Sequence, residues 1–264
     1  MANDRTEKLE AFGKLLDVID ILRVKCPWDA KQTNESLRPN TIEETMELCD
    51  ALINDDAVNI KKELGDVLMH ILFYSVIANE KGQFDIADVC NAIREKLIYR
   101  HPHIIFGETK VNSAEEVLQN WEALKLKEKG GNKTVLAGVP KSLPSIIKAE
   151  RIQEKTSNVG FDWAKKEDVW DKVKEEISEV EQEMKRGDNV NTEKEFGDLL
   201  FSVINAARLY GVRADNALEL TNIKFTNRFN YIEQQALSQG KRVNELSLDE
   251  MDNLWNEAKN LNEQ

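Results

Sequence analysis

The chain has 264 residues, a net charge of −12 and a pI near 4.9, with 12 Gly and 5 Pro. This acidity excludes nucleic acid as the main partner, because phosphate backbones are bound by basic surfaces. The composition favours an all-α fold and the length fits two domains of about 130 residues. No apolar run is long enough to predict a membrane span. The 3 cysteines lack CxxC spacing, which indicates reduced thiols and a cytoplasmic protein.

The first predicted element is an amphipathic helix over residues 5–24, where apolar residues recur at helical spacing. The segment from Cys26 to Pro39 is expected to be a loop or a short helix. Thr41 followed by Glu44 fits a capping box for the next helix, a role that competes with metal binding by Glu44. We therefore expect that helix to begin near residue 41.

This helix opens the first of two acidic hairpins. Glu44 and Glu47 are three residues apart, as are Glu63 and Asp66, so each pair shares one helix face. The midpoint between the pairs falls in Asn54-Asp55-Asp56, which is a turn-forming sequence. Two antiparallel helices joined there would place the pairs opposite each other. The sequence thus predicts four converging carboxylates.

Two further helices are predicted after the hairpin, the first carrying Lys96 and Arg100 near its end and the second presenting Trp121. A stretch with Gly and Pro then divides the chain. We predict an N-terminal helical domain, a linker and a C-terminal helical domain, at residues 1–129, 130–145 and 146–264. Residues 143–156 are predicted to form the C-terminal counterpart of the first helix.

The second acidic hairpin repeats the pattern of the first. Glu176 and Glu179 are three residues apart, as are Glu195 and Asp198, and Gly187 lies halfway between the pairs among turn formers. Antiparallel helices joined at Gly187 would bring both pairs to the same height. Such a group of carboxylates requires cations.

Asp198 opens an apolar run, residues 199–207, so we expect its carboxylate to be partly buried. An ionised carboxylate is costly to bury unless it is paired or coordinates a metal. The simpler interpretation, a solvated acidic helix face, is the usual one for Glu-rich stretches. The expected burial of Asp198 and the duplication of the hairpin favour a metal site instead.

The duplication extends beyond the acids. Six positions match without a gap at a shift of 132 residues: Glu43, Glu44, Glu47, Glu63, Gly65 and Asp66 with Glu175, Glu176, Glu179, Glu195, Gly197 and Asp198. Three more match at shifts of 128 and 134: Lys96, Arg100 and Trp121 with Lys224, Arg228 and Trp255. We interpret the chain as an internal duplication, in which each copy has a hairpin, a K-x-x-x-R helix and a W-x-x-x-K helix.

The residue types in this pattern point to a nucleotide site. Carboxylate oxygens without imidazole or thiolate favour Mg²⁺, with Mn²⁺ as a substitute, over zinc. Because Mg²⁺ is commonly held by carboxylates together with substrate phosphates, we expect a polyphosphate substrate. Lys and Arg suit phosphate oxygens, and a tryptophan can stack on a base or ribose. Displacement at phosphorus by water is the expected reaction.

Two other classes of protein use grouped acids. A di-iron carboxylate bundle needs Glu-x-x-His, and none of the 3 histidines has Glu three residues earlier. The alternative that stays open is a non-catalytic, metal- or nucleotide-binding helical interaction protein. It would show no metal-dependent turnover and would tolerate acid-to-amide changes.

The pattern E-E-x-x-E followed by E-x-G-D, together with Cys26-Pro27-Trp28-Asp29 and Arg100-His101-Pro102-His103, resembles the MazG family of nucleoside triphosphate pyrophosphohydrolases. The resemblance covers nearly the full chain. It implies two tandem MazG-like helical bundles, a homodimer, and Mg²⁺-dependent cleavage of a nucleoside triphosphate to the monophosphate and pyrophosphate. House-cleaning of modified nucleotides is a role that this resemblance implies.

The resemblance also implies roles for individual residues. Glu175 is the expected base or water-orienting group. The expected metal ligands are Glu176, Glu179, Glu195 and Asp198, with Glu44, Glu47, Glu63 and Asp66 in the first copy. The expected substrate-binding residues are Lys224, Arg228, Trp255 and Asn205, with Lys96, Arg100 and Trp121 in the first copy. Because the first copy has Phe73 where the second has Asn205, we assign catalysis to the C-terminal copy and a structural or regulatory role to the N-terminal copy.

Overall fold

The computed structural model describes residues 3–105, 124 and 134–261. The chain divides into two compact units, Met1–Val111 and Asn112–Gln264. The described residues form helices and turns and contain no strand, which confirms the predicted all-α fold class. Within this described part, no helix combines the length and the apolar character needed to cross a membrane.

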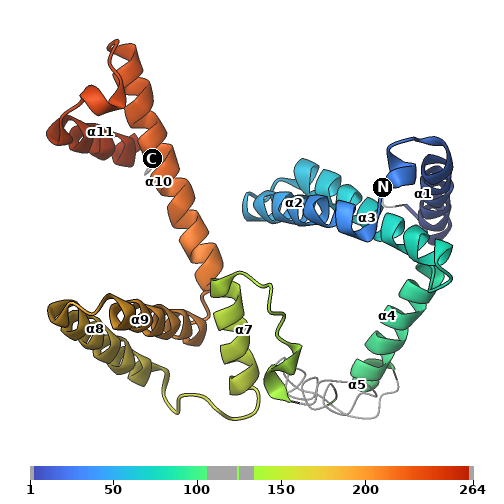
Figure 1. Cartoon of the computed structure of the whole chain (residues 1–264), viewed down its shortest axis with the longest axis horizontal. Helices are drawn as coiled ribbons and strands as arrows, with labels where there is room; N and C mark the ends of the chain where they lie inside the picture. The colour runs from blue at the N-terminus through green and yellow to red at the C-terminus, as the bar shows by residue number, and fades with distance from the viewer. Residues whose placement is uncertain (1–2, 106–123, 125–133, 262–264) are drawn as a thin grey trace. The chain divides into compact units, whose positions relative to one another are not determined.

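The first unit is organised around an antiparallel pair of helices, α2 and α3, with α1 packed on α3 (Figure 1). The predicted helix over residues 5–24 is confirmed as α1. The elements described in this unit are α1 (Arg5–Lys25), η1 (Asp29–Lys31), α2 (Asn34–Ile53), α3 (Ala57–Glu80), α4 (Ile86–Arg100) and α5 (Pro102–Ile105).

The core of the first unit lies between α1, α2 and α3. Its buried members are Ile19, Leu37, Leu72, Phe73 and Ile77. Each such side chain contributes about 1.5–3 kcal/mol when it is fully buried. This apolar cluster holds the two helices that carry the first set of acids.

Helix α2 begins earlier than the sequence predicts. Its N-cap is Thr33, which forms a reciprocal capping box with Ser36. The predicted capping box of Thr41 and Glu44 is therefore wrong. The predicted loop or short helix contains η1, but it ends before α2 begins at Asn34 and does not reach Pro39. Pro39 lies inside the helix near its start, where its missing N–H removes only one helical hydrogen bond.

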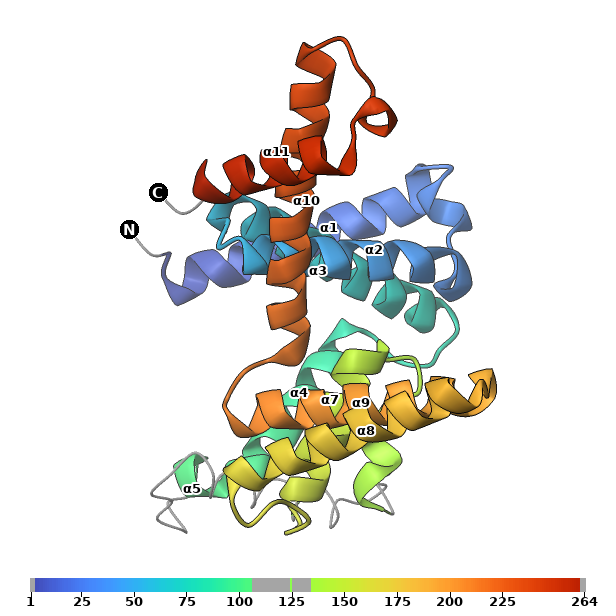
Figure 2. The same cartoon turned by 90° about the vertical axis from the view of Figure 1, so that its left-hand side faces the viewer.

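The second unit contains the hairpin of α8 and α9, with α7 packed on α9. Figure 2 shows α8 alongside α9, and α11 folded back against α10. The predicted helix over residues 143–156 is confirmed as α7. The elements described here are η2 (Val135–Gly138), α7 (Ser145–Ser157), η3 (Lys166–Asp168), α8 (Val169–Arg186), α9 (Asn189–Leu209), α10 (Ala214–Ser238), η4 (Val243–Glu245) and α11 (Leu248–Leu261).

Both hairpins turn where the sequence predicts. Asp55 has φ 51° between α2 and α3, and Gly187 has φ 74° between α8 and α9. Glycine adopts this left-handed conformation without a Cβ clash, and Asp is among the side chains that tolerate it. Asp56 and Asp188 then cap the following helices through their carboxylates. These turn and cap residues determine where along each hairpin the acids of the two helices face each other.

Candidate active site

The α8–α9 hairpin brings together the acids of the C-terminal copy. Carboxylate oxygens of Glu176 and Glu179 on α8 and of Glu195 on α9 lie within 4.8 Å of one another. They converge because a spacing of three keeps each pair on one helix face and Gly187 reverses the chain between the pairs. Asp198, the fourth predicted member, lies outside this set of oxygens.

Asp198 is exposed, so its predicted partial burial is wrong. The apolar run that follows it does not cover the carboxylate, because Leu200 and Val203 are themselves 61% and 43% exposed. Asp198 does line the same cavity as Glu176. Asp198 is therefore connected to the cluster through the cavity that it lines together with Glu176.

Glu176 is the buried member of the cluster, at 4% exposure. Its Oε1 accepts a hydrogen bond from Lys172 Nζ at 2.7 Å, and Lys172 also donates to Glu175 at 2.8 Å. These bonds to Glu175 and Glu176 raise the pKa of Lys172. The other oxygen of Glu176, Oε2, is buried without a hydrogen-bond partner among the described residues. One buried carboxylate oxygen is thus left for a further ligand.

Glu179 has a raised pKa. Burial contributes most to this rise, followed by the close approach and negative charge of the Glu176 carboxylate and then by the negative charge of Glu195. Carboxylates crowded in this way disfavour their own ionisation unless a positive charge joins them. The electrostatics of the cluster therefore favour a bound cation.

A cavity of about 660 Å³ opens beside these acids. Helix α7 contributes Gln153 to its wall, the loop before α8 contributes Trp163, α8 contributes Glu176, and α9 contributes Asp198 and Asn205. Its volume falls within the range of small-molecule sites. The acidic cluster and a sizeable cavity therefore adjoin each other.

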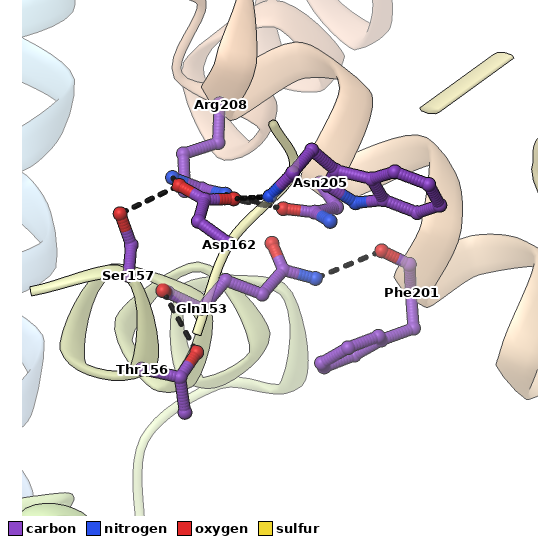
Figure 3. A network of polar contacts seen from close by, with 8 residues as sticks. Gln153, Thr156, Ser157, Asp162, Phe201, Asn205 and Arg208 are labelled. Carbon is purple, nitrogen blue, oxygen red and sulfur yellow. Dashed lines mark hydrogen bonds and ion pairs between the residues drawn. The ribbon is translucent and has the colours of Figure 1, made fainter. Parts of the chain in front are cut away.

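Arg208 anchors a polar network in the cavity wall (Figure 3). It donates to both oxygens of Asp162, at 2.6 and 3.0 Å, and twice to Asn205 Oδ1, at 2.8 and 3.0 Å. Asp162 also accepts from Ser157 Oγ at 2.6 Å and from the Trp163 N–H at 2.9 Å. Burial acts to raise the pKa of Asp162, but these hydrogen bonds outweigh it and lower that pKa. The network fixes the orientation of the Asn205 amide.

The N-terminal copy has a second cluster, in which carboxylate oxygens of Glu44, Glu63 and Asp66 lie within 4.8 Å of one another. Glu47 lies outside this set. Lys62 Nζ stands 2.8 Å from Glu63 and 3.8 Å from both Glu47 and Asp66. A lysine of the same chain therefore already places a positive charge among these acids.

The buried acid differs between the two copies. In the N-terminal copy it is Glu63, at 4% exposure and with Oε2 unpartnered among the described residues, whereas its counterpart Glu195 is half-buried. In the C-terminal copy it is Glu176, whose counterpart Glu44 is half-buried. Burial and the negative charge of Asp66 raise the pKa of Glu44.

The donor sets of both clusters fit a divalent cation. Each cluster offers three converging carboxylates, and each includes one buried oxygen without a partner among the described residues. Carboxylate oxygens are the ligands that Mg²⁺ and Mn²⁺ take in proteins.

The substrate-binding residues predicted on the last two helices lie apart from the cavity. The Arg228 guanidinium lies 5.4 Å from the centroid of the Trp255 ring, and its Nε is buried without a partner among the described residues. Lys224 is exposed. The cavity is lined by residues of α7, α8, α9 and the α7–α8 connection, so these three do not line it. Asn205 does line it.

Of the N-terminal counterparts, Lys96 is exposed and Arg100 is half-buried, both on α4. Trp121 lies outside the described residues. Phe73, which stands at the position of Asn205, is 3% exposed in the core of its unit. The first unit therefore packs an apolar ring where the second presents an amide to a cavity.

Sequence reasoning missed Lys172, Gln153, Asp162 and Arg208. Lys172 did carry a local signal, because it stands four residues before Glu176 on one helix face. The other three gain their roles only in the fold. Asp162 and Arg208 are 46 residues apart, and Gln153 bonds to a backbone carbonyl 48 residues away.

A protein-family model described as the MazG nucleotide pyrophosphohydrolase domain matches residues 32–105 and 165–232. The chain belongs to the MazG family. The two matched segments contain the two acidic hairpins, in agreement with tandem MazG-like bundles. Membership in the MazG family confirms the predicted enzyme class, a nucleotide pyrophosphohydrolase.

Curated relatives extend the MazG match to nearly the full chain. The chain is 39% identical over 258 residues to a nucleoside triphosphate pyrophosphohydrolase of Escherichia coli (strain K12), covering 95% of this chain and 98% of the relative. It is 40% identical over 251 residues to the nucleoside triphosphate pyrophosphohydrolase/pyrophosphatase MazG of Thermotoga maritima. That match covers 94% of this chain and 95% of the relative. It is also 44% identical over 236 residues to an uncharacterized protein, YabN, of Bacillus subtilis. That match covers 89% of this chain and 48% of the relative.

Proposed function

We propose that this MazG protein hydrolyses nucleoside triphosphates between the α and β phosphates, releasing the nucleoside monophosphate and pyrophosphate, and that the C-terminal cluster is its active site. The main support for this active site is the convergence of Glu176, Glu179 and Glu195 beside a cavity of about 660 Å³. The names of the Escherichia coli and Thermotoga maritima relatives support the reaction.

We assign a required Mg²⁺ to Glu176, Glu179, Glu195 and Asp198, with Mn²⁺ as a substitute. The unpartnered Oε2 of Glu176 and the raised pKa of Glu179 support this assignment. When bound, Mg²⁺ neutralises phosphate charge and lowers the pKa of a water molecule. The four acids would hold that charge beside the cavity, which Glu176 and Asp198 line.

Glu175 is our choice for the group that orients the attacking water and takes its proton. It is exposed on α8, where its Oε1 accepts a hydrogen bond from Lys172 at 2.8 Å. Because Lys172 also holds Glu176, it fixes the spacing between the proposed base and the proposed ligand. A carboxylate within reach of water suits general-base catalysis.

Lys224, Arg228 and Trp255 are proposed to contact the triphosphate from outside the cavity. Lysine and arginine donate to phosphate oxygens, and the contact of Arg228 with the Trp255 ring orients the guanidinium. Asn205 is proposed to contact the nucleoside, because it lines the cavity.

The N-terminal copy is proposed to be structural or regulatory. Lys62 stands among its acids, and Phe73 fills the core at the position of Asn205. In this copy, we propose that the residues predicted to bind substrate take no part in hydrolysis. They are Lys96, Arg100 and Trp121. Its acids can still hold a cation, because their oxygens converge as in the C-terminal copy.

We further propose that the chain forms a homodimer through the apolar faces of its hairpins, and that it works in the cytoplasm. On α9, Phe196, Leu200 and Val203 recur at helical spacing and are 45%, 61% and 43% exposed. On α3, the matching Leu64 and Ile71 are 52% and 42% exposed. Apolar stripes of this kind are usually buried in helical bundles.

Identification of the products tests the proposed reaction. The protein is incubated with each common ribo- and deoxynucleoside triphosphate, and with modified ones, in Mg²⁺ or in EDTA, and the products are separated by anion exchange. We expect equal amounts of monophosphate and pyrophosphate, formed only with the cation. Formation of diphosphate and phosphate, or no turnover of any triphosphate, would contradict the proposal.

A further inference from the structure

The cavity beside the acidic cluster extends along α9. Asp198, Ser202, Asn205 and Arg208 all line it. Seven residues of helix separate Asp198 from Asn205, which corresponds to about 10 Å along the axis. The cavity therefore continues well beyond the position that the acids assign to the phosphates.

Gln153 provides an unused acceptor in this wall. It is 4% exposed, and its Nε2 donates to the Phe201 carbonyl oxygen at 2.9 Å. This bond fixes the amide orientation, because the reverse orientation would set two oxygens against each other. Its Oε1 is buried and has no partner among the described residues. Figure 3 shows the Gln153 side chain reaching from α7 toward α9, with the amide oxygen turned away from Phe201. A buried acceptor of this kind is costly unless a donor reaches it.

Asn205 complements Gln153 with a donor. Its Oδ1 accepts two hydrogen bonds from Arg208, and Asp162 holds Arg208 in turn. With the oxygen engaged, the Nδ2 group is the part of the amide left to donate to a ligand. The wall thus offers one oriented acceptor and one oriented donor.

Three aromatic side chains accompany these amides in the cavity wall. Phe161, Trp163 and Phe201 are 81%, 38% and 41% exposed. Exposed rings beside an oriented donor and acceptor suit a flat heterocycle, because its faces stack while its edge forms hydrogen bonds.

We infer that this cavity is the nucleobase subsite, in which an N–H of the base donates to Gln153 Oε1 and the Asn205 amide donates to the adjacent ring nitrogen or carbonyl. The inference rests on the proposed function and names the residues that would determine its specificity for the base. Every common nucleobase carries an N–H beside an acceptor on its pairing edge. The subsite therefore accepts a range of triphosphates and rejects bases that lack that N–H.

A comparison of ATP with purine riboside 5′-triphosphate tests this inference, because the second lacks the 6-amino group of the first. We expect kcat/KM for ATP to exceed that for the analogue by about 10-fold or more in the wild type, since the analogue leaves a buried acceptor unpaired. In Gln153→Met the ratio should fall to about one. In Gln234→Met, the same change at an exposed position of α10, the ratio should stay at the wild-type value.

The possible outcomes test the nucleobase subsite and the proposed hydrolysis reaction separately. Equal kcat/KM for both triphosphates in the wild type, with turnover intact, would overturn the subsite and leave the proposed function standing. A folded Gln153→Met protein that keeps the wild-type ratio would also overturn it. Failure of the wild type to hydrolyse either triphosphate would overturn the proposed function itself. The wild-type comparison decides the question even if Gln153→Met does not fold.

Discussion

Lys172 Nζ lies 2.7 Å from Glu176 Oε1, and the second oxygen of this carboxylate is buried without a partner among the described residues. The lysine therefore neutralises only part of the charge that α8 buries. A cation at Oε2 would neutralise the rest, so folding stability and cation binding are linked at this carboxylate.

We predict that Lys172→Met lowers the melting temperature in EDTA by roughly 2–6 °C, because it leaves Glu176 without its counter-charge. Saturating Mg²⁺ should narrow that difference. Lys174→Met is the matched control, since Lys174 pairs at 2.9 Å with Asp171 at a highly exposed site. Scanning calorimetry measures all three proteins. Equal melting of the two variants in EDTA would contradict the linkage.

Lys62 is predicted to weaken cation binding by the N-terminal cluster. Its ammonium lies 2.8 Å from Glu63, so Lys62→Met should raise the Mn²⁺ affinity of that cluster by about 5-fold or more. Titration calorimetry measures the affinity in a Glu176→Gln/Glu179→Gln background, which removes the C-terminal site. Lys61→Met, at the adjacent exposed position, should leave the affinity unchanged. The prediction fails if Lys62→Met and Lys61→Met bind Mn²⁺ equally.

The Asp162–Arg208 pair is predicted to make stability depend on pH. Because the folded pKa of Asp162 lies below its ordinary value of 3.8, its contribution is present above that value and is lost as the pH falls through the folded pKa. Asp162→Asn should cost about 1 kcal/mol at pH 7, and the difference from the wild type should shrink below pH 4. Urea denaturation at several pH values measures it, with Asp171→Asn as the exposed control. A difference that is constant with pH would argue against the ion pair.

The hairpins could be predicted from the sequence because their signals are local. The spacing of the acids, Gly187 and the Asn54–Asp56 turn each act within a few residues. The start of α2 could not be predicted in this way, because Ser36 replaces the usual Glu or Gln of a capping box and Pro39 normally marks a break.

The site was predictable only in part. Its acids follow the helical period, but the exposure of Asp198 depends on whether another surface covers the apolar stripe of α9. The acceptor of Gln153 depends on a contact with Phe201, 48 residues away, that no spacing in the sequence reveals. Tertiary packing decides both features.

The apolar stripe of α9 predicts the effect of a charge on assembly. We expect the wild type to have about twice the 30.2 kDa mass of the chain in light scattering, and Leu200→Asp to shift toward the monomer. Leu237→Asp carries the same change on α10 at 69% exposure and should stay dimeric. A monomeric wild type, or equal effects of the two variants, would rule out this interface.

Pyrophosphate release by two matched double variants in Mg²⁺ tests whether the C-terminal cluster is the active site. If the C-terminal cluster is the active site, Glu176→Gln/Glu179→Gln should lose about 100-fold or more in kcat/KM while staying folded by circular dichroism. Glu44→Gln/Glu47→Gln, the same changes in the N-terminal copy, should stay within about 3-fold of the wild type. Loss of turnover in the N-terminal variant, with the C-terminal variant active, would place the active site in the N-terminal cluster instead.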